Sequence, residues 1–177
     1  MLRHWRAKDW AARASRDSAA GRPINLWVLM LNSELEACLN DCFRRARETG
    51  HELLSVEHLL LAILPVPRIE EILRACHADV SKLMQDLIAH IDSTTLPRVD
   101  RETEVVPTFG FQRVLQRAVF HVQSAGKKEV GVSEVLIAVF REKQSDAVRL
   151  LKEQNVTHLD VVNYISLGVT RDPDREG

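Results

Sequence analysis

The sequence is poor in aromatic residues and in cysteine, and it has no long apolar run. Its 177 residues include 5% aromatics and three cysteines. No apolar segment approaches the roughly 18–20 residues that cross a bilayer as a helix. A small, odd number of cysteines without close spacing argues against a secreted disulfide scaffold. These absences favour a globular domain in a reducing compartment, and we expect a cytoplasmic protein.

The chain also lacks a strong net charge. Its formal net charge of −1 gives no overall indication of nucleic-acid binding. The charge is nevertheless uneven, because residues 1–29 carry six Lys/Arg against two Asp/Glu, whereas residues 30–177 carry 18 against 23. The three tryptophans also lie in the first stretch. We therefore expect residues 1–29 to be an extension outside the core fold, either a flexible basic arm or an upstream translation that precedes a natural start at Met30.

Two stretches of the sequence show the same apolar pattern at a separation of 76 residues. Apolar residues at i, i+3, i+4, i+7 and i+8 form the buried stripe of one helix face. The first stripe is Leu35, Cys38, Leu39, Cys42, Phe43 and Ala46, and the second is Phe111, Val114, Leu115, Ala118, Val119 and Val122. Gly50 and Gly126 follow the two stripes at the same separation, each suited to a left-handed helix end. The pattern predicts an internal repeat.

This repeat predicts an all-α fold, in which two four-helix copies pack around a pseudo-two-fold axis. No strand pattern of useful length is present, so we expect no sheet. The 76-residue register should reach the last helices, where it pairs Val80 with Val156 and Leu83 with Leu159. The predicted helices are 33–49, 55–64, 68–76 and 79–91 in the first copy, and 108–125, 132–141, 145–154 and 157–166 in the second.

The predicted domain covers residues 30–171. Repeat 1 spans about 33–91, a polar linker follows at 92–107, and repeat 2 spans about 108–166. Residues 172–177 would begin a further linker. The stripe predicts that the equivalent leucines of the copies are buried: Leu39, Leu60, Leu115 and Leu136.

Helix starts can be assigned from short polar patterns. Ser33 and Glu36 have the spacing of a capping box, in which each side chain satisfies the other residue's backbone N–H. Ser55 is placed to cap the next helix, and Glu57 in its first turn would complement the helix dipole.

Catalytic motifs are not evident. A phosphate-binding loop needs Gly-x-x-x-x-Gly-Lys-Ser/Thr, and the nearest match, Gly126-Lys127, lacks the first glycine and the hydroxyl residue. Cys38 and Cys42 lie in the apolar stripe, which favours core packing over metal binding. One cluster could hold a metal and leaves a metal-dependent hydrolase open as an alternative: His51, Glu52, Glu57 and His58.

Four strings carry a resemblance to a known family. They are residues 30–36 (MLNSELE), 56–63 (VEHLLLAI), 111–126 (FQRVLQRAVFHVQSAG) and 159–166 (LDVVNYIS). Over about residues 30–171 the chain resembles the N-terminal domains of bacterial ClpA-type AAA+ unfoldases. VEHLL is shared by all Clp N-domains, whereas the third and fourth strings are similar to ClpA in particular.

The resemblance implies a double Clp-N repeat with no enzymatic activity, cofactor or metal of its own. ATP would be bound by modules outside this chain. The family's N-domain docks the adaptor ClpS and helps to deliver protein substrates to the AAA+ ring and the ClpP protease. Nucleic acid and membrane are not expected partners. A free-standing Clp-N repeat protein that binds partners without an ATPase is the other alternative.

Matching the family's adaptor-contact positions one by one gives five residues: Glu52, Glu57, Thr108, Arg117 and His158. At His158 a close relative has an arginine, so this position departs from the pattern. Arg117 lies off the apolar stripe and should be exposed. Glu52 and Glu57 should project together at one end of the first repeat.

Overall fold

The apolar stripes of the sequence become helices that face one another across a shared core. The computed structural model describes residues 30–95 and 104–168; the predicted extension 1–29, part of the predicted linker and residues 169–177 lie outside them. The first copy contains α2 (Ser33–Thr49), α3 (Val56–Ile63), α4 (Pro67–Ala75) and α5 (Val80–Thr94). The second contains α6 (Phe109–Ser124), α7 (Val132–Val139), α8 (Asp146–Glu153) and α9 (His158–Leu167). The all-α repeat fold is confirmed, and each helix begins within one residue of its predicted start.

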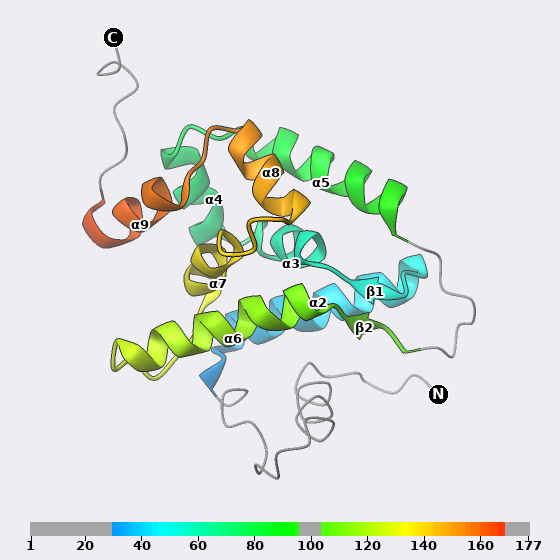
Figure 1. Ribbon diagram of the computed structural model, residues 1–177, viewed down its shortest axis with the longest axis horizontal. Helices are drawn as coiled ribbons and strands as arrows, with labels where there is room; N and C mark the ends of the chain where they lie inside the picture. The colour runs from blue at the N-terminus through cyan, green and yellow to red at the C-terminus, as the bar shows by residue number, and fades with distance from the viewer. Residues whose placement is uncertain (1–29, 96–103, 169–177) are drawn as a thin grey trace.

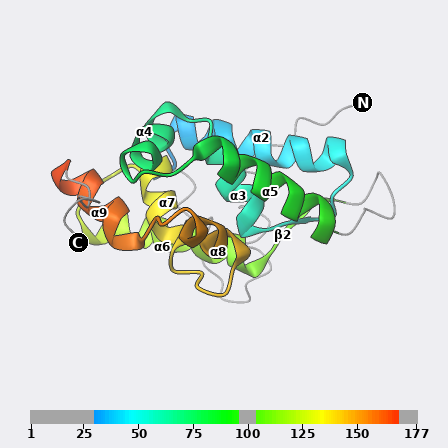
Figure 2. The same cartoon turned by 90° about the horizontal axis from the view of Figure 1, so that it is seen from above.

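The first helices of the two copies, α2 and α6, overlap in the view of Figure 1 but lie on opposite sides in Figure 2, with α3 and α7 between them in the middle of the molecule. The rings of Phe43 and Phe111 meet edge to face across α2 and α6, with centroids 6.2 Å apart. The predicted core leucines are all buried: Leu39, Leu60, Leu115 and Leu136. No described helix is long and apolar enough to cross a membrane.

The caps agree with the sequence except at the first helix. Gly50 ends α2 at φ 78°, a left-handed conformation as predicted. Ser55 caps α3, together with His58 three residues later. The cap of α2, however, is Asn32, whose Oδ1 accepts from the Leu35 N–H at 2.9 Å. Asn32 still has extended backbone while Ser33 is already helical, so the predicted cap at Ser33 was wrong by one residue.

Two short strand contacts join the copies, and the prediction of no sheet was wrong in this detail. Strand β1 (Leu53–Leu54) pairs in parallel with β2 (Val106–Pro107), and Leu31 forms an isolated parallel bridge with Val130. Two residues are too few to show an alternating pattern in the sequence.

The two strand contacts are equivalent to each other under the 76-residue repeat. Adding 76 to 31 gives 107 and adding 76 to 54 gives 130, so the Leu31–Val130 and Leu54–Pro107 pairs exchange roles between the copies. The Asn32 N–H donates to Val130 O at 2.9 Å, and the equivalent Thr108 N–H donates to Leu54 O at 2.8 Å. The pseudo-two-fold axis therefore relates backbone hydrogen bonds as well as helices.

The 76-residue register does not reach the last helices. His77 and Asn155, which have left-handed backbone after the third helices, are 78 residues apart, as are the starts of α5 and α9. Leu83 is therefore equivalent to Val161, and both are buried, whereas Leu159 is 64% exposed. The predicted pairing of Leu83 with Leu159 was wrong, because the connection before α8 is longer than the one before α4.

Candidate partner-binding groove

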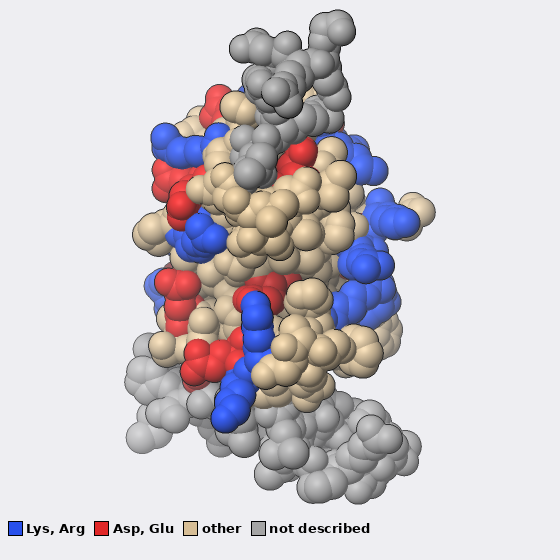
Figure 3. Space-filling model, turned by 90° about the vertical axis from the view of Figure 1, so that its left-hand side faces the viewer, with Lys and Arg blue, Asp and Glu red and all other residues tan. Residues whose placement is uncertain are grey.

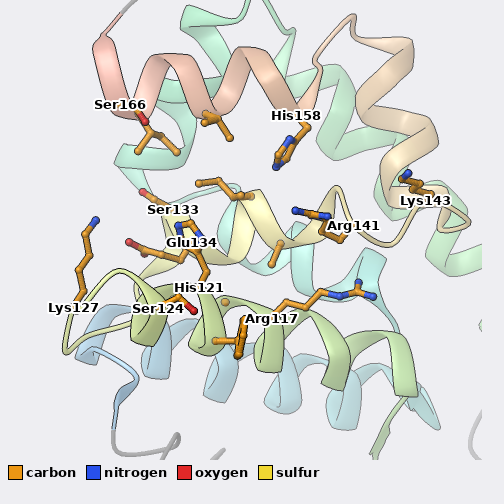
Figure 4. Close-up of a pocket in the computed structure, with 16 residues that line it drawn as sticks. Arg117, His121, Ser124, Lys127, Ser133, Glu134, Arg141, Lys143, His158 and Ser166 are labelled. Atoms are coloured by element: carbon orange, nitrogen blue, oxygen red, sulfur yellow. The ribbon is translucent and has the colours of Figure 1, made fainter.

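A groove lies between α6, α7 and α9, all in the second copy (Figure 4). Its volume is about 720 Å³. Phe120 of α6 lines the groove and is 71% exposed. The remaining apolar lining comes from all three helices: Ala118, Ile137, Ala138, Val162 and Ile165.

The rim of the groove is basic. Arg117 comes from α6, Lys127 from the connection after α6, and Arg141 and Lys143 from the connection after α7. The one acidic lining residue, Glu134, accepts the Gly131 N–H at 2.9 Å and so supports the start of α7. At this end of the molecule, Lys and Arg form a band along one edge without acidic neighbours, whereas both signs alternate along the opposite edge (Figure 3).

The rim cations differ in whether an anion neutralises them. Glu142 accepts from Arg117 at 2.7 Å and from Arg113 at 2.8 Å. These guanidinium groups, Arg113 first, lower the pKa of Glu142, so it stays ionised. Within the described ranges no ion pair involves Arg141, Lys143 or Lys127. The groove therefore has unneutralised positive charge at its mouth.

His158 begins α9 and faces the groove (Figure 4). Its ring packs edge to face on Phe140, with centroids 5.9 Å apart. Burial, and then the neighbouring charge of Arg141, lower the pKa of His158 below its ordinary value. Both effects favour the neutral imidazole.

Two of the five predicted contact residues come together in this groove, and two others lie at the strand pair. Arg117 and His158 both line the groove. Glu52 and Thr108 lie beside β1 and β2: Glu52 O accepts the Val106 N–H at 3.0 Å, and Thr108 N–H donates to Leu54 O. Thr108 also caps α6 by accepting the Phe111 N–H at 3.2 Å.

Glu57 does not project with Glu52, so that expectation was wrong. Its side chain is buried, and Oε1 accepts the Ala147 N–H at 3.1 Å in the first turn of α8. Since α3 lies in the middle of the molecule, its first turn meets the second copy instead of solvent. Glu57 therefore stabilises a helix start of the other repeat.

The cluster that suggested a metal-dependent hydrolase does not assemble. His51 Nδ1 and His58 Nε2 are 3.2 Å apart, and His58 Nδ1 meets the Ser55 hydroxyl at 2.7 Å. Burial, and then His51, lower the pKa of His58 to about 4. Because Glu57 points to α8 instead, the four residues do not share a site.

Other potential metal ligands and nucleophiles either pair with one another or are held protonated by burial. Glu57, His90 and Asp146 approach one another, but His90 Nε2 already meets Asp146 at 3.2 Å. Burial raises the pKa of Cys42 to about 12 and that of Cys76 to about 11. Both thiols are therefore protonated and unreactive at neutral pH.

The described residues thus define a helical repeat domain with a groove in its second copy. Residues 30–154 match the family described as the Clp repeat (R) N-terminal domain. The chain belongs to this family of Clp N-terminal domains.

Known relatives agree with this family. A ClpA homolog protein of Fuscovulum blasticum is 42% identical over 148 residues, which cover 82% of this chain and 19% of the relative. The chain therefore spans about a fifth of that relative's length.

Solved structures share the fold at low identity. The Hsp104 N-terminal domain of Candida albicans superposes with a TM-score of 0.68 at 14% identity, over 82% of this chain and 97% of that one. The ClpV N-domain of Vibrio cholerae gives 0.66 at 15%, over 86% and 95%. A complex of a ClpV N-domain with a VipB peptide gives 0.62 at 16%, over 80% and 88%.

Proposed function

We propose that this domain recruits proteins to a ClpA-type unfoldase in the cytoplasm. It docks a ClpS-type adaptor, and through it protein substrates reach an AAA+ ring and the ClpP protease. ATP binding and unfolding belong to other modules of such a machine. The relative with 42% identity is a ClpA homolog, and a ClpV N-domain of the same fold forms a complex with a peptide.

The observation that carries this proposal is the groove shared by Arg117 and His158. These two positions come from different helices; Arg117 matches the adaptor-contact pattern of the family, and His158 occupies a contact position at which a close relative has arginine. Thr108 and Glu52 lie at the start of α6, and Arg117 is nine residues further along that helix, or about 14 Å. One adaptor could therefore contact the strand pair and the groove together. Glu57 contributes indirectly, because it stabilises the start of α8 and does not contact the adaptor itself.

Calorimetry of ClpS with the 177-residue chain tests the proposal. The double variant Arg117→Glu with His158→Glu should bind at least about tenfold more weakly, or roughly 1.4 kcal/mol, because the groove would then repel acidic groups of the adaptor. A matched control is Arg74→Glu with Lys152→Glu, since both side chains are exposed away from the groove. ClpS that binds neither wild type nor variants would contradict the proposal, and equal affinities would remove the groove from the interface.

A further inference from the structure

We infer that the groove between α6, α7 and α9 binds an amphipathic α-helix of a partner protein whose carboxylates lie in its first turns. This inference rests on the proposed recruiting function and adds the kind of segment that is recruited. It is argued from the apolar lining, from the position of the free cations and from the secondary structure of the walls.

The lining requires an apolar side on the occupant. Ile137 of α7 and Val162 and Ile165 of α9 all line the groove. All three are only partly buried, so a partner's apolar side chains would remove further surface from water, at about 25 cal/mol per Å². A fully polar ligand would gain nothing from this surface.

The free charges lie mainly at one end. Arg141 and Lys143 stand near His158, at the end of the groove where α9 begins, whereas Lys127 stands at the far end (Figure 4). Arg141 and Lys143 form no ion pair within the described residues. Carboxylates at this end of the occupant would therefore find cations that no protein anion neutralises.

The walls favour a helix over a strand. Strand addition needs a sheet edge with free N–H and C=O groups, whereas all three walls here are helices, which satisfy their own backbone. An amphipathic helix needs only an apolar channel. The part of α6 that lines the groove, from Arg117 to Ser124, is about 10 Å long, enough to contact about two turns of a bound helix.

The helix dipole sets the direction of the occupant. Asp and Glu are most favourable in the first turn of a helix, where they complement the partial positive charge of its N-terminus. An acidic first turn beside Arg141 and Lys143 satisfies both requirements. The occupant should therefore enter with its N-terminus at this end, and its apolar residues should follow at i, i+3, i+4 and i+7 towards Lys127.

A display library of random peptides of about 16 residues, panned on the 177-residue chain, tests this inference. Selected sequences should be enriched in Asp and Glu at the N-terminal end, followed by apolar residues at helical spacing. A labelled synthetic peptide with this consensus is then titrated by fluorescence anisotropy. Its affinity should fall about tenfold or more with Arg141→Glu plus Lys143→Glu, and should stay unchanged with the control pair Arg74→Glu plus Lys152→Glu.

Other outcomes would overturn the inference. These include basic or uniformly apolar selected peptides, or acidic peptides that bind the groove variant as tightly as wild type. A labelled oligonucleotide that binds wild type and is lost with Arg141→Glu plus Lys143→Glu would assign the rim to phosphates instead. If ClpS binds but no acidic peptide requires the groove, the recruiting function stands and this inference fails. If peptides bind as expected and ClpS does not, the proposed adaptor is wrong and the groove inference stands.

Discussion

The two copies share a core and differ on their surfaces. On α2, Asp41 pairs with Arg44 and, at 2.9 Å, with Arg45, so the charges of this helix neutralise one another. The positions 76 residues later on α6 are Arg117, Phe120 and His121, and all three line the groove. The duplicated pattern therefore specifies burial, while the positions outside it differ between the copies.

The last helices differ in the same way. Helix α5 has 15 residues and α9 has 10. With the 78-residue register, Leu87 corresponds to Ile165; Leu87 is fully buried, whereas Ile165 is half-buried and lines the groove. The equivalent position is therefore closed in the first copy and open to the groove in the second. In this duplicated fold, the groove arises where the second copy departs from the first.

The largest expected effect concerns the part that the copies share. Leu39→Ala and Leu115→Ala remove equivalent, fully buried side chains from α2 and α6. Each should lower the free energy of unfolding by about 2–5 kcal/mol, because a cavity remains in the core. Urea denaturation measures both. A variant that unfolds at the wild-type midpoint would show that its copy contributes little to the shared core.

The second prediction separates the copies by their response to acid. At the third residue of the second helix, α3 has His58 and α7 has Glu134. The pKa of His58 is lowered to about 4, whereas an unfolded histidine titrates near 6.5. Between these values the unfolded state binds more protons, so stability falls as the pH decreases from about 6.5 to 4.

The His58→Gln variant tests this difference, since the amide can still accept the Ser55 N–H that His58 Nδ1 accepts at 3.1 Å. Between pH 7 and pH 4.5 the variant should lose about 2 kcal/mol less of its unfolding free energy than wild type does. Urea titrations at both pH values measure the loss. Identical losses would mean that His58 accepts a proton in the folded protein at its ordinary pKa.

A third prediction concerns the first turns of α3 and α7. Glu57 and Ser133 are equivalent positions, but only Glu57 is buried against the other copy. Glu57→Ala should cost about 1–3 kcal/mol, because the Ala147 N–H loses its acceptor, whereas Ser133→Ala should stay within about 0.5 kcal/mol. Thermal melts followed by circular dichroism measure both. Equal effects would show that Glu57 is no more than a surface residue.

Sequence periodicity could predict the core because burial repeats with the turn of a helix. Leu39, Leu60, Leu115 and Leu136 were found at the right positions, and the helix starts were found with them. The same reasoning failed at Leu159, since a longer connection before α8 shifts the register by two residues. A fixed offset cannot detect such a shift when both alternatives are apolar.

The groove was only partly predictable. Arg117 could be predicted to lie on the surface because it is off the apolar stripe. His158 was predicted as a contact residue from the family resemblance. Arg141, Lys143 and Lys127 were missed because they lie in connections, whose course depends on tertiary packing. The signal that could have indicated them is the positive charge next to the ends of the predicted helices of the second copy. Glu57 was misplaced for the same reason, because its burial depends on the arrival of α8.

The smallest expected effect is a pH dependence of peptide binding that only the second copy can show. The pKa of His158 is lowered by burial and then by Arg141. The other charged or titratable groups of the lining are Arg117 and His121 from α6, Glu134 from α7, and Lys127 and Lys143 from the connections. A peptide carboxylate beside Arg141 offsets this positive charge and favours the imidazolium, so binding is coupled to uptake of a proton. Affinity for the acidic peptide should therefore rise about two- to fivefold between pH 7.5 and pH 6.

His158→Arg, which introduces the residue of a ClpA-type relative, should bind tightly at both values and lose the dependence, whereas His121→Gln should retain it. Anisotropy titrations in this range avoid protonation of the peptide's own carboxylates. An unchanged pH response in His158→Arg would show that another group takes up the proton.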